Sequence, residues 1–454
     1  MKQKMRYILL GIGLIIFNAS AFCQTTKWRD IYTVKKKDTI FGIANKYGLS
    51  LPELMEANPE MKKEGYMLQK GATIFIPFEK NTATTAGAAQ TNVAQKQVAP
   101  QKKANTVNVG VMLPLHDVDG DGKRMVEFYR GILMACEKLK QQGISTNIHA
   151  WNVPIDADIR TTLVQEGANQ CDLIFGPLYT KQVASLADFC KTYGIKMVIP
   201  FSINGDLVDR CKEIFQVYQS PESLNDASIK AFLNRFKNVH PIFVDCNDST
   251  SRKGNFTFGL RKELEKRKIT YSVTNVNSSL EYFAKSFVPS KQNVVILNTG
   301  RSPQLTQVLN KLDEFTAKYP GADISLYGYT EWLMYAKYNL DRFYKYDTYI
   351  PSTFYYNANS AKTIDLESKY NTWFHQPMQV AMPRFAITGY DQAMFFIQGV
   401  NKYGKNFTGQ MTQVNYTPVQ TPLHFVKTSK GGYRNQILQL IHYTFNRQIE
   451  AVTY

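Results

Sequence analysis

The sequence predicts an α/β protein in which a small βααβ domain precedes a two-lobed domain with doubly wound parallel sheets. Two observations lead to this prediction. Strand-like apolar runs alternate with amphipathic helical patterns from residue 107 to the C-terminus, and the alternation restarts near residue 220. A segment poor in large apolar residues, 79–106, separates this region from a compact unit at residues 30–78 and is expected to be a flexible linker.

The N-terminal residues 1–23 have the pattern of a secretory signal peptide. Three basic residues precede an apolar run that is too short to span a bilayer, and small residues at 19–21 follow. The bulky Phe22 disfavours a lipid anchor at Cys23. We therefore expect an exported, periplasmic chain that is associated with the cell wall and has no transmembrane segment after processing.

The composition favours an anionic partner. The formal net charge is +17, from 54 basic and 37 acidic residues. Nucleic acid is not expected for an exported chain without a recognisable binding motif, whereas the carboxylate-rich wall polymer is within reach. The cysteines after residue 23 lie in apolar runs, so buried thiols are expected. The sequence indicates no cofactor.

The small domain reads as strand, helix, helix, strand. A strand at 31–34 leads to a helix at about 39–47, and Ser50 is expected to cap a second helix. The last strand, 73–76, ends at Pro77.

These residues resemble a LysM domain. The resemblance is carried by Tyr32-Thr33-Val34, Asp38-Thr39, Ile43-Ala44, Tyr47-Gly48, Leu54, Asn58-Pro59, Gly71, Ile74 and Ile76-Pro77, although Lys37 stands where the family usually has Gly. It implies binding of N-acetylglucosamine-containing peptidoglycan in a shallow groove between two loops. The expected glycan-binding residues are Asp38, Thr39, Ile40, Phe41, Asn58, Pro59 and Glu60. Alternatively, Asp38 and Thr39 cap the first helix.

The large domain, 107–454, resembles the type I periplasmic binding proteins, which include branched-chain amino-acid receptors and penicillin-binding-protein activators. The resemblance is carried by residues 109–115, 174–178, 198–202 and 389–391. It implies one lobe from 107–218 and 385–454 and a second from 219–384. Ligands in such folds bind at the carboxyl ends of the strands. The expected cleft residues are Leu115, Gly176, Pro177, Leu178, Tyr179, Thr180, Ser202 and Arg301.

Two positions disfavour a free amino acid as the ligand of this cleft. Receptors of that kind hold the ammonium with a hydroxyl residue, where this chain has Ile203, and with a carboxylate, where an approximate alignment gives Gln304. A buried ammonium without these partners would be poorly paired. Arg301 would favour an anion instead, unless it is a solvated surface residue.

No metal site or catalytic site is predicted. The acidic run 117–122 begins like a calcium loop, but Phe128 stands where the closing carboxylate should be, so an acidic turn is expected. None of the six histidines lies in a recognisable catalytic pattern. We therefore expect a protein that is not an enzyme.

Two functions remain open. The first is a wall-bound protein whose two-lobed domain recognises a wall fragment or an envelope protein, such as a peptidoglycan synthase, and so regulates peptidoglycan synthesis. The second is a solute-binding receptor for a transporter or sensor. The aromatic-rich stretch 327–356 is either a partner surface or core packing.

Overall fold

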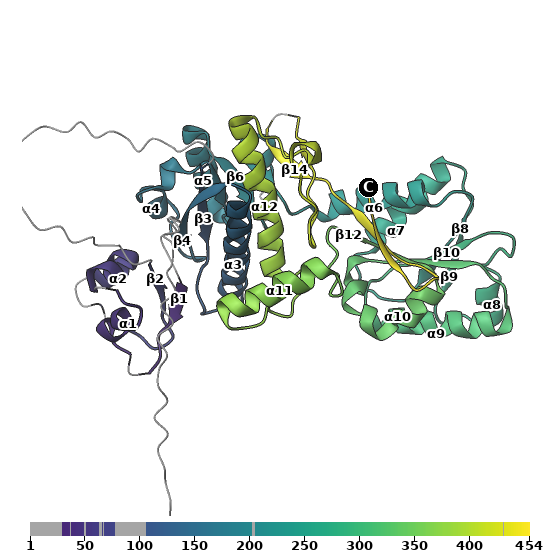
Figure 1. Ribbon diagram of the computed structural model, residues 1–454. Coiled ribbons are helices and arrows are strands. Elements are labelled where there is room, and N and C mark those ends of the chain that lie inside the picture. Colours follow the sequence, from purple (N-terminus) through teal and green to yellow (C-terminus); the bar gives the residue numbers. More distant parts are fainter. Residues whose placement is uncertain are drawn as a thin grey trace, which may run out of the picture.

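The computed structural model describes residues 30–36, 38–49, 51–62, 66, 68–77, 106–201, 205–429 and 431–454. The described chain forms a small N-terminal unit and two larger lobes (Figure 1). Within these ranges no helix has the length and apolar character that a membrane crossing requires. The expected signal peptide, Ser50 and nearly all of the expected linker lie outside the described residues.

The small unit has the predicted βααβ order. Its elements are β1 (Asp30–Thr33), α1 (Ile40–Lys46), α2 (Leu51–Ala57), the 3-10 helix η1 (Pro59–Lys62) and β2 (Thr73–Ile76). The two strands are antiparallel, with Tyr32 opposite Ile74. Ile43, Leu54 and Ile74 lie in one buried cluster, so the two helices and the strand pair share a small core.

The first lobe contains a seven-stranded sheet in the order β13-β14-β7-β6-β5-β3-β4. Its strands are β3 (Thr106–Leu113), β4 (Ser145–Asn152), β5 (Leu173–Phe175), β6 (Lys196–Ile199), β7 (Ile214–Gln216), β13 (Phe425–Lys427) and β14 (Tyr433–Asn435). All pairs are parallel except β13 with β14. Strands β5, β6 and β7 are buried throughout, as expected for a sheet that is covered on both faces.

The helices of the first lobe are α3 (Gly120–Gln141), α4 (Arg160–Leu163), α5 (Thr180–Tyr193), α11 (Ala361–Phe374) and α12 (Phe385–Tyr403). Helices α3 and α12 lie side by side (Figure 1) and touch through their backbones at two glycines. A Cβ atom on Gly131 would lie 1.9 Å from the carbonyl oxygen of Ala386, and one on Gly389 would lie 2.0 Å from that of Phe128. The two glycines therefore set how closely these helices approach.

The second lobe has a sheet in the order β16-β15-β12-β11-β10-β8-β9. Its strands are β8 (His240–Asp245), β9 (Ser272–Asn275), β10 (Asn293–Leu297), β11 (Ile324–Tyr327), β12 (Thr348–Ser352), β15 (Gln439–Tyr443) and β16 (Ile449–Thr453). Its helices are α6 (Pro221–Arg235), α7 (Gly254–Lys266), α8 (Leu280–Ala284), α9 (Ser302–Lys318) and α10 (Ala336–Lys345), with the 3-10 helix η4 (Thr330–Met334). Strands β8 to β12 pair in parallel, whereas β15 and β16 are antiparallel additions.

The lobe boundaries differ from the expected division at two places. Strands β15 and β16, expected in the first lobe, pair with β12 and extend the second sheet. Helix α11, expected in the second lobe, packs on the first, because Leu366 and Tyr370 share a buried cluster with Met134 of α3. The division at 385 is therefore corrected: the chain returns to the first lobe before α11 and leaves it again after β14.

The small unit touches the first lobe. The Thr33 hydroxyl donates a hydrogen bond to a carboxylate oxygen of Asp117 at 3.1 Å, and the Asp117 N–H donates to the Thr73 hydroxyl at 3.2 Å. Ala57 and Phe75 belong to the same buried cluster as the core of the first lobe. The two units are therefore in contact, although the sequence predicts only a linker between them.

The aromatic-rich stretch is mostly core. Trp332 is fully buried, and Tyr329 and Tyr344 are nearly so, whereas Tyr338 is exposed. Core packing, one of the two interpretations of this stretch, is therefore confirmed for Trp332, Tyr329 and Tyr344.

Candidate functional site

The first expected glycan loop is fixed by its own hydrogen bonds. An Asp38 carboxylate oxygen accepts from the Lys35 N–H at 2.7 Å and from the Tyr32 hydroxyl at 2.8 Å. These two donors lower the pKa of Asp38, the backbone N–H more strongly. The Thr39 hydroxyl oxygen accepts from the Gly42 N–H at 3.0 Å and so caps α1. Thr39 therefore caps α1, as the alternative predicted, whereas Asp38 ties the turn to Lys35 and Tyr32 and does not cap the helix.

The next two residues, which begin α1, differ in exposure. The side chain of Phe41 is 63% exposed, whereas Ile40 is half-buried against the core of the small unit. A large exposed aromatic side chain is well suited to an apolar contact with a sugar ring. Phe41, at the start of α1, accordingly offers apolar surface to a ligand.

The second expected glycan loop requires a correction at Asn58. This side chain is fully buried, donates to the carbonyl oxygens of Leu54 and Phe75, and accepts from the Phe75 N–H, each at 2.8 Å. Asn58 therefore ties α2 to β2 and has no free surface for a glycan. Pro59 and Glu60 are exposed in η1.

In the first lobe, part of the expected cleft wall is buried. Leu115 has no exposed surface, and its N–H donates to the Asn152 side chain at 2.8 Å, so its assignment as a cleft residue is corrected. Gly176 and Pro177 are also buried. Leu178 and Tyr179 are half-buried and Thr180 is exposed, so these three have surface for a ligand. Ser202 lies outside the described residues.

In the second lobe, Arg301 has partners within the protein. Its guanidinium donates to the Thr250 hydroxyl at 3.1 Å and lies 3.7 Å from a carboxylate oxygen of Asp248. The hydroxyl groups of Thr250 and Thr299 donate hydrogen bonds to the Asp248 carboxylate and lower its pKa. The positive charge of Arg301 lowers this pKa further, by a smaller amount. The positive charge of Arg301 is thus partly balanced by Asp248, which makes a strong anion site here less favourable.

An ion pair that follows β11 was not predicted from the sequence. Lys253 donates to a carboxylate oxygen of Glu331 at 2.7 Å, and its ammonium lies 4.7 Å from the centre of the Tyr329 ring. The alignment that placed Gln304 at the carboxylate position did not identify Glu331. The two residues are 78 positions apart, so no local pattern could have paired them. The Glu331 carboxylate is thus paired with an ammonium of the chain itself.

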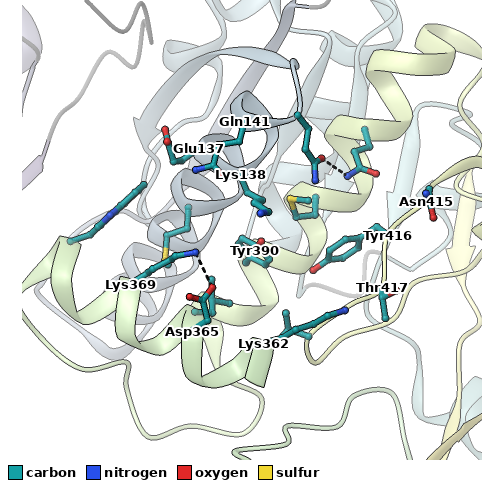
Figure 2. Close-up of a pocket in the computed structure, with 17 residues that line it drawn as sticks. Glu137, Lys138, Gln141, Lys362, Asp365, Lys369, Tyr390, Asn415, Tyr416 and Thr417 are labelled. Atoms are coloured by element: carbon teal, nitrogen blue, oxygen red, sulfur yellow. Dashed lines mark hydrogen bonds and ion pairs between the residues drawn. The ribbon is translucent and has the colours of Figure 1, made fainter. Parts of the chain in front are cut away.

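A cavity of about 520 Å³ lies elsewhere, on the first lobe between α3, α11, α12 and the segment 415–419 (Figure 2). None of the expected cleft residues within the described ranges lines it. Its lining combines lysines, carboxylates, side-chain amides and aromatic rings. They include Lys138, Gln141, Lys362, Asp365, Trp373 and Tyr416.

The acidic turn and the cysteines have structural roles. In the acidic turn, Asp119 accepts from the Gly122 N–H at 2.7 Å and caps α3, and Asp121 is paired with Arg124 at 2.5 Å. Among the described residues no group of three or more His, Cys, Asp or Glu side chains is placed to hold a metal ion. Cys136, Cys171, Cys190, Cys211 and Cys246 are all buried, and burial raises the pKa of each thiol. The expectation of buried thiols is confirmed.

Comparison with known proteins agrees with this architecture. The LysM domain model matches residues 32–77. A structure described as a branched-chain amino acid ABC transporter from Rhodospirillum rubrum is 13% identical, with a TM-score of 0.52, and covers 76% of this chain and 100% of its own. A branched-chain amino acid ABC transporter periplasmic ligand-binding protein from Burkholderia xenovorans is 14% identical, with a TM-score of 0.44, and covers 76% of this chain and 95% of its own. No curated protein matches the chain.

A LysM domain implies binding to N-acetylglucosamine-containing glycan of peptidoglycan. The likeness to the Rhodospirillum rubrum structure, at this level of identity, concerns the fold of the large domain alone. The chain therefore contains a LysM domain at residues 32–77, followed by a two-lobed domain with the type I periplasmic binding protein fold.

Proposed function

We propose that this protein is a non-catalytic component of the cell envelope that binds peptidoglycan through its LysM domain and recognises a wall fragment or an envelope protein through its two-lobed domain. The observation that carries the proposal is the LysM match over residues 32–77, in which Phe41, at the start of α1, is exposed to solvent. The excess of basic residues supports association with a carboxylate-rich polymer. A wall-bound protein of this kind would act in the periplasm and is a candidate regulator of a peptidoglycan synthase.

The second candidate, a solute-binding receptor for a transporter or sensor, is favoured by the fold of the large domain. Two ion pairs at the strand ends argue against free amino acids as its ligand. Glu331 is paired with Lys253, and Arg301 lies beside Asp248. An amino acid would have to displace an internal ammonium before its own could be bound.

The glycan proposal is tested by sedimentation of the chain, residues 24–454, with purified sacculi. Phe41→Ala is expected to reduce the sedimented fraction several-fold, because the apolar contact with the glycan is lost. Phe258→Ala is the matched control, since Phe258 is also 63% exposed but lies on α7 of the second lobe. An unsubstituted chain that stays in the supernatant would contradict the proposal.

The two candidates for the large domain are separated by thermal unfolding and by crosslinking in cells. A receptor for branched-chain amino acids would be stabilised by millimolar leucine through mass action, and we expect no such shift here. A wall-bound regulator is expected to crosslink to a peptidoglycan synthase. A large leucine-dependent shift without that crosslink would favour the receptor.

A further inference from the structure

The cavity on the first lobe has walls that are held rigidly. Helices α3 and α12 meet at Gly131 and Gly389 without intervening side chains. The buried carboxylate of Asp391 in α12 accepts from the N–H groups of Val419, Gln420 and Thr421 at 2.7 to 2.8 Å, and from the Tyr416 hydroxyl. These bonds fasten the segment that forms one wall to α12. A preformed cavity of about 520 Å³ lies within the usual range for small-molecule sites.

The cavity is lined by charges of both signs. Within the described structure Lys138 of α3 and Lys362 of α11 have no carboxylate partner, whereas Lys369 is paired with Asp365 at 2.8 Å. Figure 2 shows the Lys138 side chain close to Tyr390 and the Lys362 side chain close to Thr417, both on the walls of the cavity. Glu137 also lines the cavity. Two free ammonium groups suit carboxylates, and the acidic side chains suit an amine on the same ligand.

The remaining lining suits a peptide backbone. Gln141, Gln398 and Asn415 present side-chain amides, which can both donate to and accept from peptide groups. Trp373, which is 45% exposed, and Tyr390 supply apolar surface for small side chains. The lysines of this lining could therefore bind the carboxylates of such a ligand, and the side-chain amides could bind its peptide groups.

We infer that this cavity binds a short peptide with free carboxylates, and that its source is the stem peptide of soluble peptidoglycan fragments. The choice of source rests on the proposed function, because the LysM domain places the chain on the wall polymer that carries such peptides. All the walls belong to the first lobe, so binding needs no movement of the second. The site is distinct from the strand-end positions at which ligands of this fold are expected.

The inference is tested by calorimetric titration of residues 24–454 with a disaccharide tetrapeptide released from sacculi. The Lys138→Gln/Lys362→Gln double variant is expected to raise the Kd at least about tenfold, because two charge-assisted hydrogen bonds are lost. Both lysines are exposed, so the variant should fold. The control is Lys337→Gln/Lys402→Gln, which removes the same charge at exposed positions outside the cavity. A linear tetrapeptide of L-amino acids is the second ligand.

The inference holds if the wall fragment binds, the cavity variant weakens binding and the control variant does not. Absence of heat with the wall fragment overturns it, as does equal binding by both variants. Binding of the L-peptide alone overturns the assignment to wall peptides. The outcome is separate from the LysM proposal, because the cavity variant should sediment with sacculi as the unsubstituted chain does, whereas Phe41→Ala should not change the titration.

Discussion

The two lobes share one architecture but differ in how their polar side chains are paired. In the second lobe, the charged residues that follow the parallel strands have partners from the chain itself, as in Lys253 with Glu331 and Arg301 with Asp248. In the first lobe, two lysines of one cavity have no carboxylate partner within the described structure. The comparison teaches that residue type alone does not identify a binding position. Free polar groups in a preformed cavity are the better guide.

The largest expected effect concerns the helix crossing that shapes the cavity. Gly131→Ala should lower the free energy of unfolding by about 3 kcal/mol, because its Cβ would meet the backbone oxygen of Ala386 and the helices must separate. Gly259→Ala in the second lobe is the control, since its Cβ would meet only the end of the Ile229 side chain, at 2.9 Å. Urea unfolding checks both variants. Equal losses of unfolding free energy in the two variants would mean that the close backbone contact between α3 and α12 does not require glycine.

The next effect is a pH dependence from Glu127. Burial raises the pKa of this carboxyl from 4.5 to about 7. The hydrogen bond that it accepts from the Gln379 N–H opposes this shift. The folded state thus holds a proton that the unfolded state releases, so this contribution to stability is full below pH 4.5 and is lost as the pH rises through 7. Glu127→Gln should remove about 2 to 3 kcal/mol of the difference in unfolding free energy between pH 5 and pH 8.

A control in the second lobe should act with the opposite sign. Lys266 lowers the pKa of Glu263, so the stability that this pair contributes is present above the unfolded pKa and is lost as the pH falls. Glu263→Gln should therefore weaken the loss of stability on acidification. Urea unfolding over the same pH range measures both variants, and the same sign for both would refute the assigned causes.

A smaller effect is expected for the ion pair of the second lobe. Lys253→Ala should cost about 1 kcal/mol or less, because both side chains are partly exposed to solvent, at 28% and 42%. The variant sharpens the comparison between the lobes, since it frees the Glu331 carboxylate. Leucine is expected to stabilise neither the parent chain nor this variant strongly in thermal unfolding. Marked stabilisation of the parent chain by leucine would make the receptor the better supported of the two functions.

The smallest effect is expected for the cavity lysines. Lys362→Gln should change the free energy of unfolding by no more than about 0.5 kcal/mol, because Lys362 is exposed and makes no ion pair with a described residue. Its effect should appear in ligand binding alone. A clear loss of stability in urea unfolding would mean that Lys362 has a structural role, and the contrast between the lobes would then be weaker.

The sequence by itself determined the order of the small domain and the alternation of strands and helices in the large one. These features depend on hydrophobic periodicity and capping residues, which act over a few neighbouring positions. The LysM elements at 30–76 could therefore be placed to within a residue or two, and the buried cysteines were predictable from their apolar surroundings.

Only the tertiary structure decided which distant residues meet. The burial of Asn58 depends on the backbone of β2. The pairing of Lys253 with Glu331 joins the start of α7 to η4. The second sheet takes its last strands from the C-terminal part of the chain. The cavity joins residues 134–142 to residues 362–373 and 415–419. No local pattern encodes these contacts, because each depends on how helices and strands far apart in the chain pack together.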